Sequence, residues 1–214
     1  DFTIDYPRDR MLPSLLHRAG YQTELVGKTH FLAPPSDRVG FDHVTPTYRL
    51  YKKRLMHSGQ VHPGTGIGGN EMTPTLTRLP EELSQTYWCT DECLEFMDTR
   101  DQTQPFFLWA SYEAPHPPNS IHQPYYSMYD DAPQSEPLMP DWMNDQTAPL
   151  FEYNLRYRTN PLPMDRRALD KVRSVYFGMI TYLDHQIGRL LGRMMELGIF
   201  DDTLIIYTTD HGEK

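Results

Sequence analysis

The sequence predicts an α/β protein with a mixed, mainly parallel central sheet sandwiched between helices. Short apolar, β-branched or aromatic runs indicate strands, and stretches with a 3.6-residue apolar period indicate helices between them. The strand runs are residues 21–26, 105–112 and 204–207, and the helical stretches are 11–19, 80–98 and 165–197. Alternation of this kind favours parallel strands joined by helices, with ligands bound at the carboxyl edge of the sheet.

The first helix and strand bring a cation and an imidazole together. Residues 11–19 carry leucines on one side, and Gly20 supplies the turn into the strand at 21–26. Lys28 and His30 follow directly, two residues apart in an extended segment, so they point the same way. A lysine can hold an oxyanion and a histidine can move a proton. A surface lysine beside a packed histidine is the alternative, and the pair taken alone favours it.

Residues 33–80 show no strong period and are predicted to be loop. The glycine-rich run at 64–70 has no preceding strand, following helix or Lys-Ser/Thr pair, so it does not indicate a phosphate-binding loop. Residues 80–98 begin with proline and acidic residues, which is typical of a helix start. The face of this helix expected to be apolar consists of Leu83, Tyr87, Leu94 and Met97.

The second half of the chain places two more histidines after strands. The run at 105–112 is predicted to be a buried strand, and His116 follows it between prolines that stiffen the backbone. Residues 117–163 form a connection long enough to be a functional loop. A helix over 165–197 ends at Gly198. A third strand at 204–207, buried on both faces, leads into Asp210, His211 and Gly212.

Asp210 and His211 form a candidate metal site at the end of that third strand. A carboxylate and an imidazole suit a divalent cation, and Gly212 lets the backbone turn away beneath them. An ordinary turn with a capping aspartate is the alternative.

Composition excludes several functional classes. With 214 residues the chain is about one domain long, and its net charge is −9 with neutral histidines. It contains no basic block, which argues against a nucleic-acid partner, and no apolar run long enough to cross a membrane. Cys89 and Cys93 lie one helical turn apart and are expected to be core thiols.

Four stretches together resemble the sulfatases of the alkaline-phosphatase superfamily. They are LLHRAGYQTELVGKTHF (15–31), PFFLWASYEAPHPP (105–118), YFGMITYLDHQIGRLLGRMMELGIFDDT (176–203) and LIIYTTDHGE (204–213). Their order and spacing cover nearly the whole chain. The resemblance implies an alkaline-phosphatase-like sheet between helices, with the site at its carboxyl edge.

The resemblance also implies roles for individual residues. Asp210 and His211 would bind one divalent cation, with Ca²⁺ favoured over Mg²⁺ or Mn²⁺. Lys28 would neutralise the sulfate, and His30 would contact the nucleophile and help to release sulfate from it. His116 would protonate the oxygen of the leaving group. The substrate would be a small-molecule or carbohydrate sulfate ester; compartment and oligomeric state stay open.

The chain departs from the family pattern at the nucleophile. Sulfatases make a formylglycine from the first residue of a Cys/Ser-x-Pro-x-Arg motif, and neither Cys89 nor Cys93 begins such a motif. The resemblance therefore implies that residues 1–214 are part of a catalytic domain. The first strand, the formylglycine upstream of residue 1 and a C-terminal portion would lie outside the segment, which alone is expected to be inactive.

Three functions are compatible with these residues. The first is sulfuric ester hydrolysis. The second is hydrolysis of phosphonate monoesters or phosphodiesters by a member of the same superfamily, which shares the metal and histidine arrangement. The third is a catalytically inactive relative that acts as a binding module.

Overall fold

The central sheet has three parallel strands. The structure is a computed structural model that describes residues 7–29, 38–60, 72–136, 165–209 and 211–212. In the sheet, β1 (Gln22–Gly27) lies between β2 (His43–Pro46) and β4 (Phe106–Ser111). All five residues from Thr23 to Gly27 are buried, as expected for a central strand. The prediction of an α/β fold with parallel strands is confirmed.

Several helices and two short strands complete the described fold. The elements are η1 (Arg8–Arg10), α1 (Leu12–Arg18), α2 (Thr47–His57), β3 (Thr75–Leu76), η2 (Glu81–Leu83), α3 (Gln85–Thr99), β5 (Ser120–Ile121) and α5 (Arg166–Glu196). β3 and β5 form a separate parallel pair. No described helix has the length and apolar character needed to span a bilayer.

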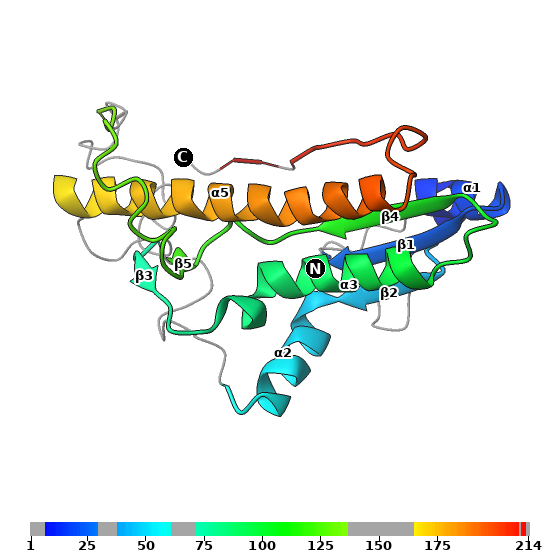
Figure 1. The fold of residues 1–214 in the computed structure, drawn as a ribbon, viewed down its shortest axis with the longest axis horizontal. Coiled ribbons are helices and arrows are strands. Elements are labelled where there is room, and N and C mark those ends of the chain that lie inside the picture. Colours follow the sequence, from blue (N-terminus) through cyan, green and yellow to red (C-terminus); the bar gives the residue numbers. More distant parts are fainter. Residues whose placement is uncertain (1–6, 30–37, 61–71, 137–164, 210, 213–214) are drawn as a thin grey trace.

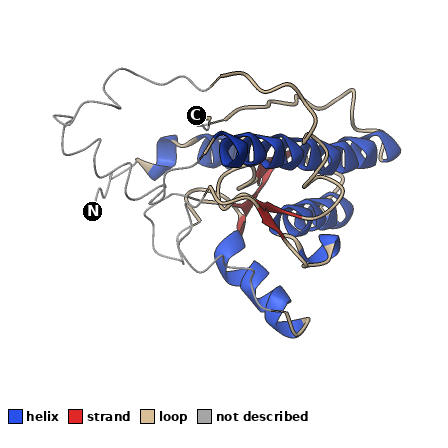
Figure 2. Ribbon diagram, turned by 90° about the vertical axis from the view of Figure 1, so that its left-hand side faces the viewer, coloured by secondary structure: helices blue, strands red, loops and turns tan. Residues whose placement is uncertain are grey.

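Helices α3 and α5 run side by side over one face of the sheet (Figures 1 and 2). Val26 of β1 and Leu108 and Ala110 of β4 face them, since alternate strand residues point the same way. The buried helical residues of this core are Tyr51, Leu55, Trp88, Cys89, Cys93, Met97, Leu190 and Met194. Both cysteines are buried and free, which confirms their prediction as core thiols.

The opposite face of the sheet carries an aromatic group. The Phe41 ring stacks on Phe107 at 5.8 Å between centroids and meets Trp109 edge-on at 6.1 Å. Trp109 remains 42% exposed, and β4 as a whole is half-buried. The prediction of a fully buried strand is wrong here, because β4 lies at an edge of the described sheet.

The long helix α5 matches its prediction closely, whereas α3 does so only in part. α5 begins after Asp165, whose side chain accepts the Ala168 N–H, and ends before Gly198 at φ 68°. For α3, Met97 is buried and Leu94 packs partly buried against the core, both as predicted, but Trp88, Cys89 and Cys93 are buried there in place of Tyr87. The side of α3 that carries Trp88, Cys89 and Cys93 faces the sheet, and the bulky Trp88 side chain is buried there.

The described elements β2, α2 and the short strand β3 lie in the region predicted to be loop and were missed. β2 and α2 occupy His43–His57, where charged residues flank the few apolar ones. Tyr51 and Leu55 are the buried residues by which the described part of α2 joins the core, with Leu50 packed partly buried beside them. So short an apolar pattern is too weak to recognise from the sequence. The glycine-rich run at 64–70, predicted to be loop and not a phosphate-binding site, lies outside the described residues.

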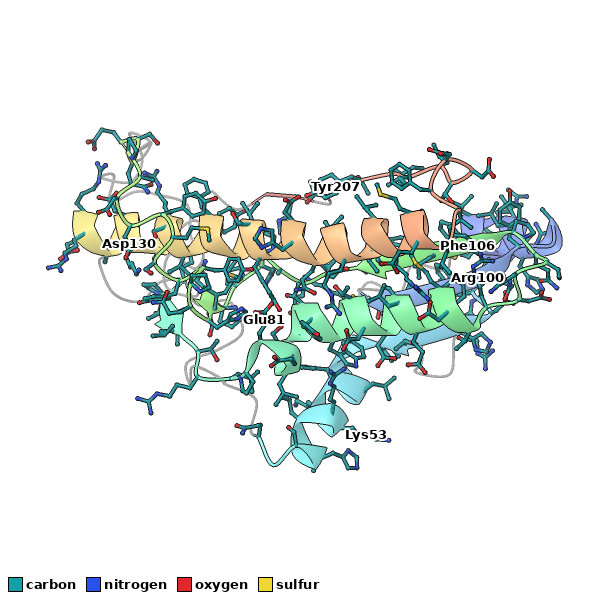
Figure 3. All side chains as sticks on the ribbon, viewed as in Figure 1. Lys53, Glu81, Arg100, Phe106, Asp130 and Tyr207 are labelled. Atoms are coloured by element: carbon teal, nitrogen blue, oxygen red, sulfur yellow. The ribbon has the colours of Figure 1, made fainter. Side chains whose placement is uncertain are left out.

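The predicted strand at residues 204–207 does not form in this structure. Leu204 is 85% exposed, Ile206 75% and Tyr207 78%, and no described strand pairs with them. Figure 1 shows the segment running back along α5 in the direction of the β1 and β4 arrows, and Figure 3 places Tyr207 beside that helix. The predicted burial is wrong because an apolar run becomes a buried strand only beside a partner.

Candidate active site

The first part of the candidate site is the end of β1. Gly27 has φ 111°, and a Cβ there would lie 2.0 Å from the Ser111 carbonyl oxygen. The same oxygen accepts the Lys28 N–H at 2.8 Å. Only glycine allows β1 and β4 to approach so closely while the chain turns. Lys28, half-buried, therefore leaves the sheet next to the segment that follows β4.

His116 is held in a tight turn after β4. Its main-chain N–H donates to the Glu113 carbonyl at 2.9 Å, and its Nδ1 lies 2.6 Å from the Pro117 carbonyl oxygen. A carbonyl can only accept, so Nδ1 carries the proton in this contact. Nε2 is then the ring nitrogen left to exchange a proton with a substrate. The half-buried ring suits a residue that must meet a ligand.

The structure brings His116 and His211 together although 94 residues separate them. Their ring centroids are 6.4 Å apart with an interplanar angle of 64°. His211 is exposed, and its Nδ1 lies 3.0 Å from the Gly212 carbonyl. The two histidines that follow the second and third predicted strands thus meet at one edge. His30 and Asp210 lie outside the described residues.

The fit of a metal ion can be judged from the donor set. Among the residues that the structure describes, no group of three or more His, Cys, Asp or Glu side chains could hold a metal ion. Asp210 and His211 would give one carboxylate and one imidazole, whereas a hard cation such as Ca²⁺ takes six or more oxygen ligands. The donors present suit a divalent cation, and further oxygen ligands would have to come from other parts of the protein.

Helix α3 anchors the segment that leads to His116. The Tyr112 hydroxyl lies 3.0 Å from Thr90 Oγ1, and Gln85 Nε2 donates a hydrogen bond to Glu113 Oε2. Burial raises the pKa of Tyr112 well above its ordinary value, so this phenol stays neutral. Sequence reasoning missed these residues. The sequence shows that Glu113 lies three residues before His116, but no sequence pattern indicates that Glu113 contacts Gln85.

A second polar cluster lies close to the start of α3. Glu81 of η2 marks this end of the helix in Figure 3, and its Oε2 lies 3.4 Å from Nε2 of the buried His122. Tyr182 packs edge-on against His122 at 4.7 Å, and its hydroxyl meets Ser84 Oγ at 2.8 Å. Burial lowers the pKa of His122, partly offset by Glu81. This cluster ties η2, α3 and α5 to the loop after His116.

Solved structures with the same arrangement define the class of fold. The phosphonate monoester hydrolase SpPMH from Silicibacter pomeroyi matches with a TM-score of 0.70 and 23% identity, over 94% of this chain and 47% of that one. The phosphonate monoester hydrolase of Agrobacterium radiobacter gives a TM-score of 0.66 and 22% identity, over 89% and 45%. The fold is that of the alkaline-phosphatase-like α/β proteins.

The sequence comparisons identify the family. A family model described as Sulfatase matches residues 6–214, and the chain belongs to the sulfatase family. The arylsulfatase of Clostridium perfringens is 26% identical over 98% of this chain and 48% of its own length. The choline-sulfatase of Rhizobium meliloti is 28% identical over 92% and 41%. The chain spans less than half the length of these relatives.

Proposed function

We propose that the protein containing this chain is a sulfuric ester hydrolase. Membership of the sulfatase family supports the activity, and relatives named arylsulfatase and choline-sulfatase support the substrate class. The observation that carries the proposal is the approach of the His116 and His211 rings to 6.4 Å. Lys28 supports it, since its main-chain N–H donates to the carbonyl of Ser111 at the end of β4, the strand that leads to His116.

The proposed chemistry is transfer of a sulfuryl group from the ester oxygen to a formylglycine outside this segment, with cleavage of the S–O bond. Lys28 neutralises charge on the sulfate, and Nε2 of His116 donates a proton to the departing oxygen. His30 acts on the nucleophile. Asp210 and His211 would hold a divalent cation, Ca²⁺ in preference to Mg²⁺ or Mn²⁺, and this cation would supply positive charge to the sulfate oxygens.

The proposed substrate is a small-molecule or carbohydrate sulfate ester. A relative named N-acetylglucosamine-6-O-sulfatase, from Bacteroides thetaiotaomicron, is 25% identical over 94% of this chain. Among the described residues, His116 is half-buried and His211 is exposed, and such accessibility is compatible with a substrate as large as a sugar.

Hydrolysis of phosphonate monoesters or phosphodiesters is the second candidate. It is supported by the two phosphonate monoester hydrolase structures, whose TM-scores of 0.66 and 0.70 compare with 0.55 for an enzyme solved with D-glucosamine-2-N,6-O-disulfate. Fold similarity at this level of identity does not select a substrate, so the sulfatase function is preferred on the family match.

Two assays on the full-length protein test the function. We expect kcat/KM for an aryl sulfate to exceed that for the matching aryl phosphonate. The reverse order would favour the phosphonate hydrolase, and no turnover of either would favour an inactive binding module.

A prediction for His116 follows from its proposed role. His116→Ala should slow substrates with poor leaving groups by about 10²–10⁴-fold, the usual contribution of a general acid. Activated aryl esters should be much less affected, because their leaving groups need no proton. The measurement is kcat/KM across a leaving-group series. Equal losses along the series would contradict the role.

A further inference from the structure

Two consecutive residues fix the chain between β4 and His116 to helix α3. Tyr112 contacts Thr90 near the middle of the helix, and Glu113 accepts a hydrogen bond from Gln85 in its first turn. Both contacts join side chains that are half-buried or buried. Hydrogen bonds shielded in this way are better suited to hold a geometry than exposed ones.

Glu113 links this anchor directly to the histidine. Its carboxylate takes the hydrogen bond from Gln85, and its main-chain carbonyl accepts the His116 N–H at 2.9 Å. A shift of the Glu113 backbone would therefore move the turn that carries the imidazole. The Nδ1 contact to Pro117 then fixes the ring relative to that turn.

The Gln85 end of the link is also held in place. Ser84 caps α3 by accepting the Tyr87 N–H at 3.2 Å. The Ser84 hydroxyl also lies 2.8 Å from the Tyr182 hydroxyl on α5. Gln85 follows this cap directly, so its position is defined by two helices. The start of α3 is thus tied to α5 next to the candidate site.

We propose that Gln85 and Glu113 are positioning residues for His116. The hydrogen bond between them sets the turn that aims Nε2 of His116 at the leaving-group oxygen. This inference rests on the proposed function, because the general-acid role of His116 belongs to it. The bond acts through geometry: the Gln85 amide donates and the Glu113 carboxylate accepts, and neither group takes part in proton transfer.

The kinetic test uses Gln85→Leu in the full-length protein. We expect kcat/KM to fall about 10- to 100-fold for sulfate esters with poor leaving groups, since misplacement by about 1 Å costs that much, with little change for activated esters. Gln102→Leu, an exposed glutamine in the turn between α3 and β4, is the matched control and should behave as wild type. A uniform loss with a lowered Tm would show a merely structural role and overturn the proposal.

A charge swap sharpens the test. Gln85→Glu alone places two carboxylates together and should be at least as damaging as Gln85→Leu. The double variant Gln85→Glu/Glu113→Gln restores one amide donor and one carboxylate acceptor with reversed polarity, so activity on poor leaving groups should return. Failure of a folded double variant to recover would overturn the proposal.

An NMR measurement separates this inference from the proposed function, because it needs no turnover. With ¹³C-labelled histidine, the imidazole signals of His116 are assigned by their loss in His116→Ala. Gln85→Leu should shift them, and the double variant should return them towards wild type. Unchanged signals in Gln85→Leu would overturn the positioning role. Absent turnover with shifted and restored signals would reject the proposed function alone.

Discussion

At the scale of single residues, Gly27 is a position near the candidate site where the backbone leaves no room for a side chain. Gly27→Ala combines an unfavourable φ with a clash against the Ser111 backbone. We expect a loss of about 2–5 kcal/mol in the free energy of unfolding, from about 1–2 for the conformation and about 1–3 for the overlap. Chemical denaturation of the full-length protein measures it.

The control for Gly27 is Gly20. Its φ is also positive, at 89°, but no atom lies within 4 Å of an added Cβ. Gly20→Ala should therefore cost only the conformational part, about 1–2 kcal/mol. Equal losses in the two variants would show that the close approach of β1 and β4 is not what requires glycine.

Glu24 is a buried acid whose ionisation weakens the fold. It is 7% exposed, and desolvation raises its pKa, although the Thr45 hydroxyl donates to its Oε1 at 3.1 Å. A carboxyl with a raised pKa binds its proton more tightly in the folded state. Its contribution to stability is therefore complete below the ordinary value of about 4.5 and is lost as pH rises through the raised pKa.

Glu24→Gln removes this pH dependence and keeps the acceptor for Thr45. We expect the variant to be more stable than wild type at pH 7, with the difference shrinking towards pH 4.5 and below. Thermal unfolding of both proteins across this range measures it. If the wild type instead became more stable relative to the variant as pH rises, the claim that the folded state raises the pKa of Glu24 would be contradicted.

The predictability of the site differs from residue to residue. The rule that parallel strands present ligands at their carboxyl edge selected Lys28, His116 and His211, and the structure places the two histidine rings together. Their chemical roles stay predictions. Gln85 could not be found, because its contact with Glu113 depends on how α3 is docked and not on any local pattern.

At the scale of elements, the contact of α5 with the loop after His116 depends on Gly178. A Cβ there would lie 2.1 Å from the Tyr125 carbonyl oxygen. Alanine favours the helix by about 1 kcal/mol, but we expect the overlap, about 1–3 kcal/mol, to dominate. Gly178→Ala should therefore lower the free energy of unfolding.

Gly188 offers the matched control on the same helix. An added Cβ meets nothing within 4 Å there, so Gly188→Ala should stabilise the protein by up to about 1 kcal/mol. Denaturant unfolding measures the change in the free energy of unfolding for each substitution. Changes of opposite sign would establish that α5 and the Tyr125 segment are packed closely. Stabilisation by both would contradict that packing.

Elements with a strong local signal were predictable, and those fixed by tertiary contacts were not. Asp165, the regular apolar period and Gly198 all mark α5. α2 has no side-chain cap and depends on Tyr51 and Leu55 docking against Trp88 and its neighbours. The buried face of α3 likewise depends on where the helix meets the sheet, which its sequence alone does not specify.

At the scale of the whole molecule, residues 204–207 are an apolar run that pairs with no described strand. The run has the composition of a buried strand, yet its side chains are largely exposed. The relatives matched here are more than twice as long as the part this chain covers. We therefore expect the segment to join a sheet in a protein of that length, beside a strand that lies outside the described residues.

If this expectation is right, Ile206→Asp should help the isolated segment 1–214 but destabilise the full-length protein. In isolated residues 1–214, Ile206→Asp breaks an exposed apolar run and should raise the soluble fraction. In the full-length protein it would place a carboxylate in a buried strand and should cost roughly 2–5 kcal/mol or more. Gln102→Asp adds the same charge at an exposed turn and controls for net charge. Soluble yield and thermal unfolding are the measurements. A full-length Ile206→Asp protein as stable as the control would mean that the run stays exposed in the complete molecule.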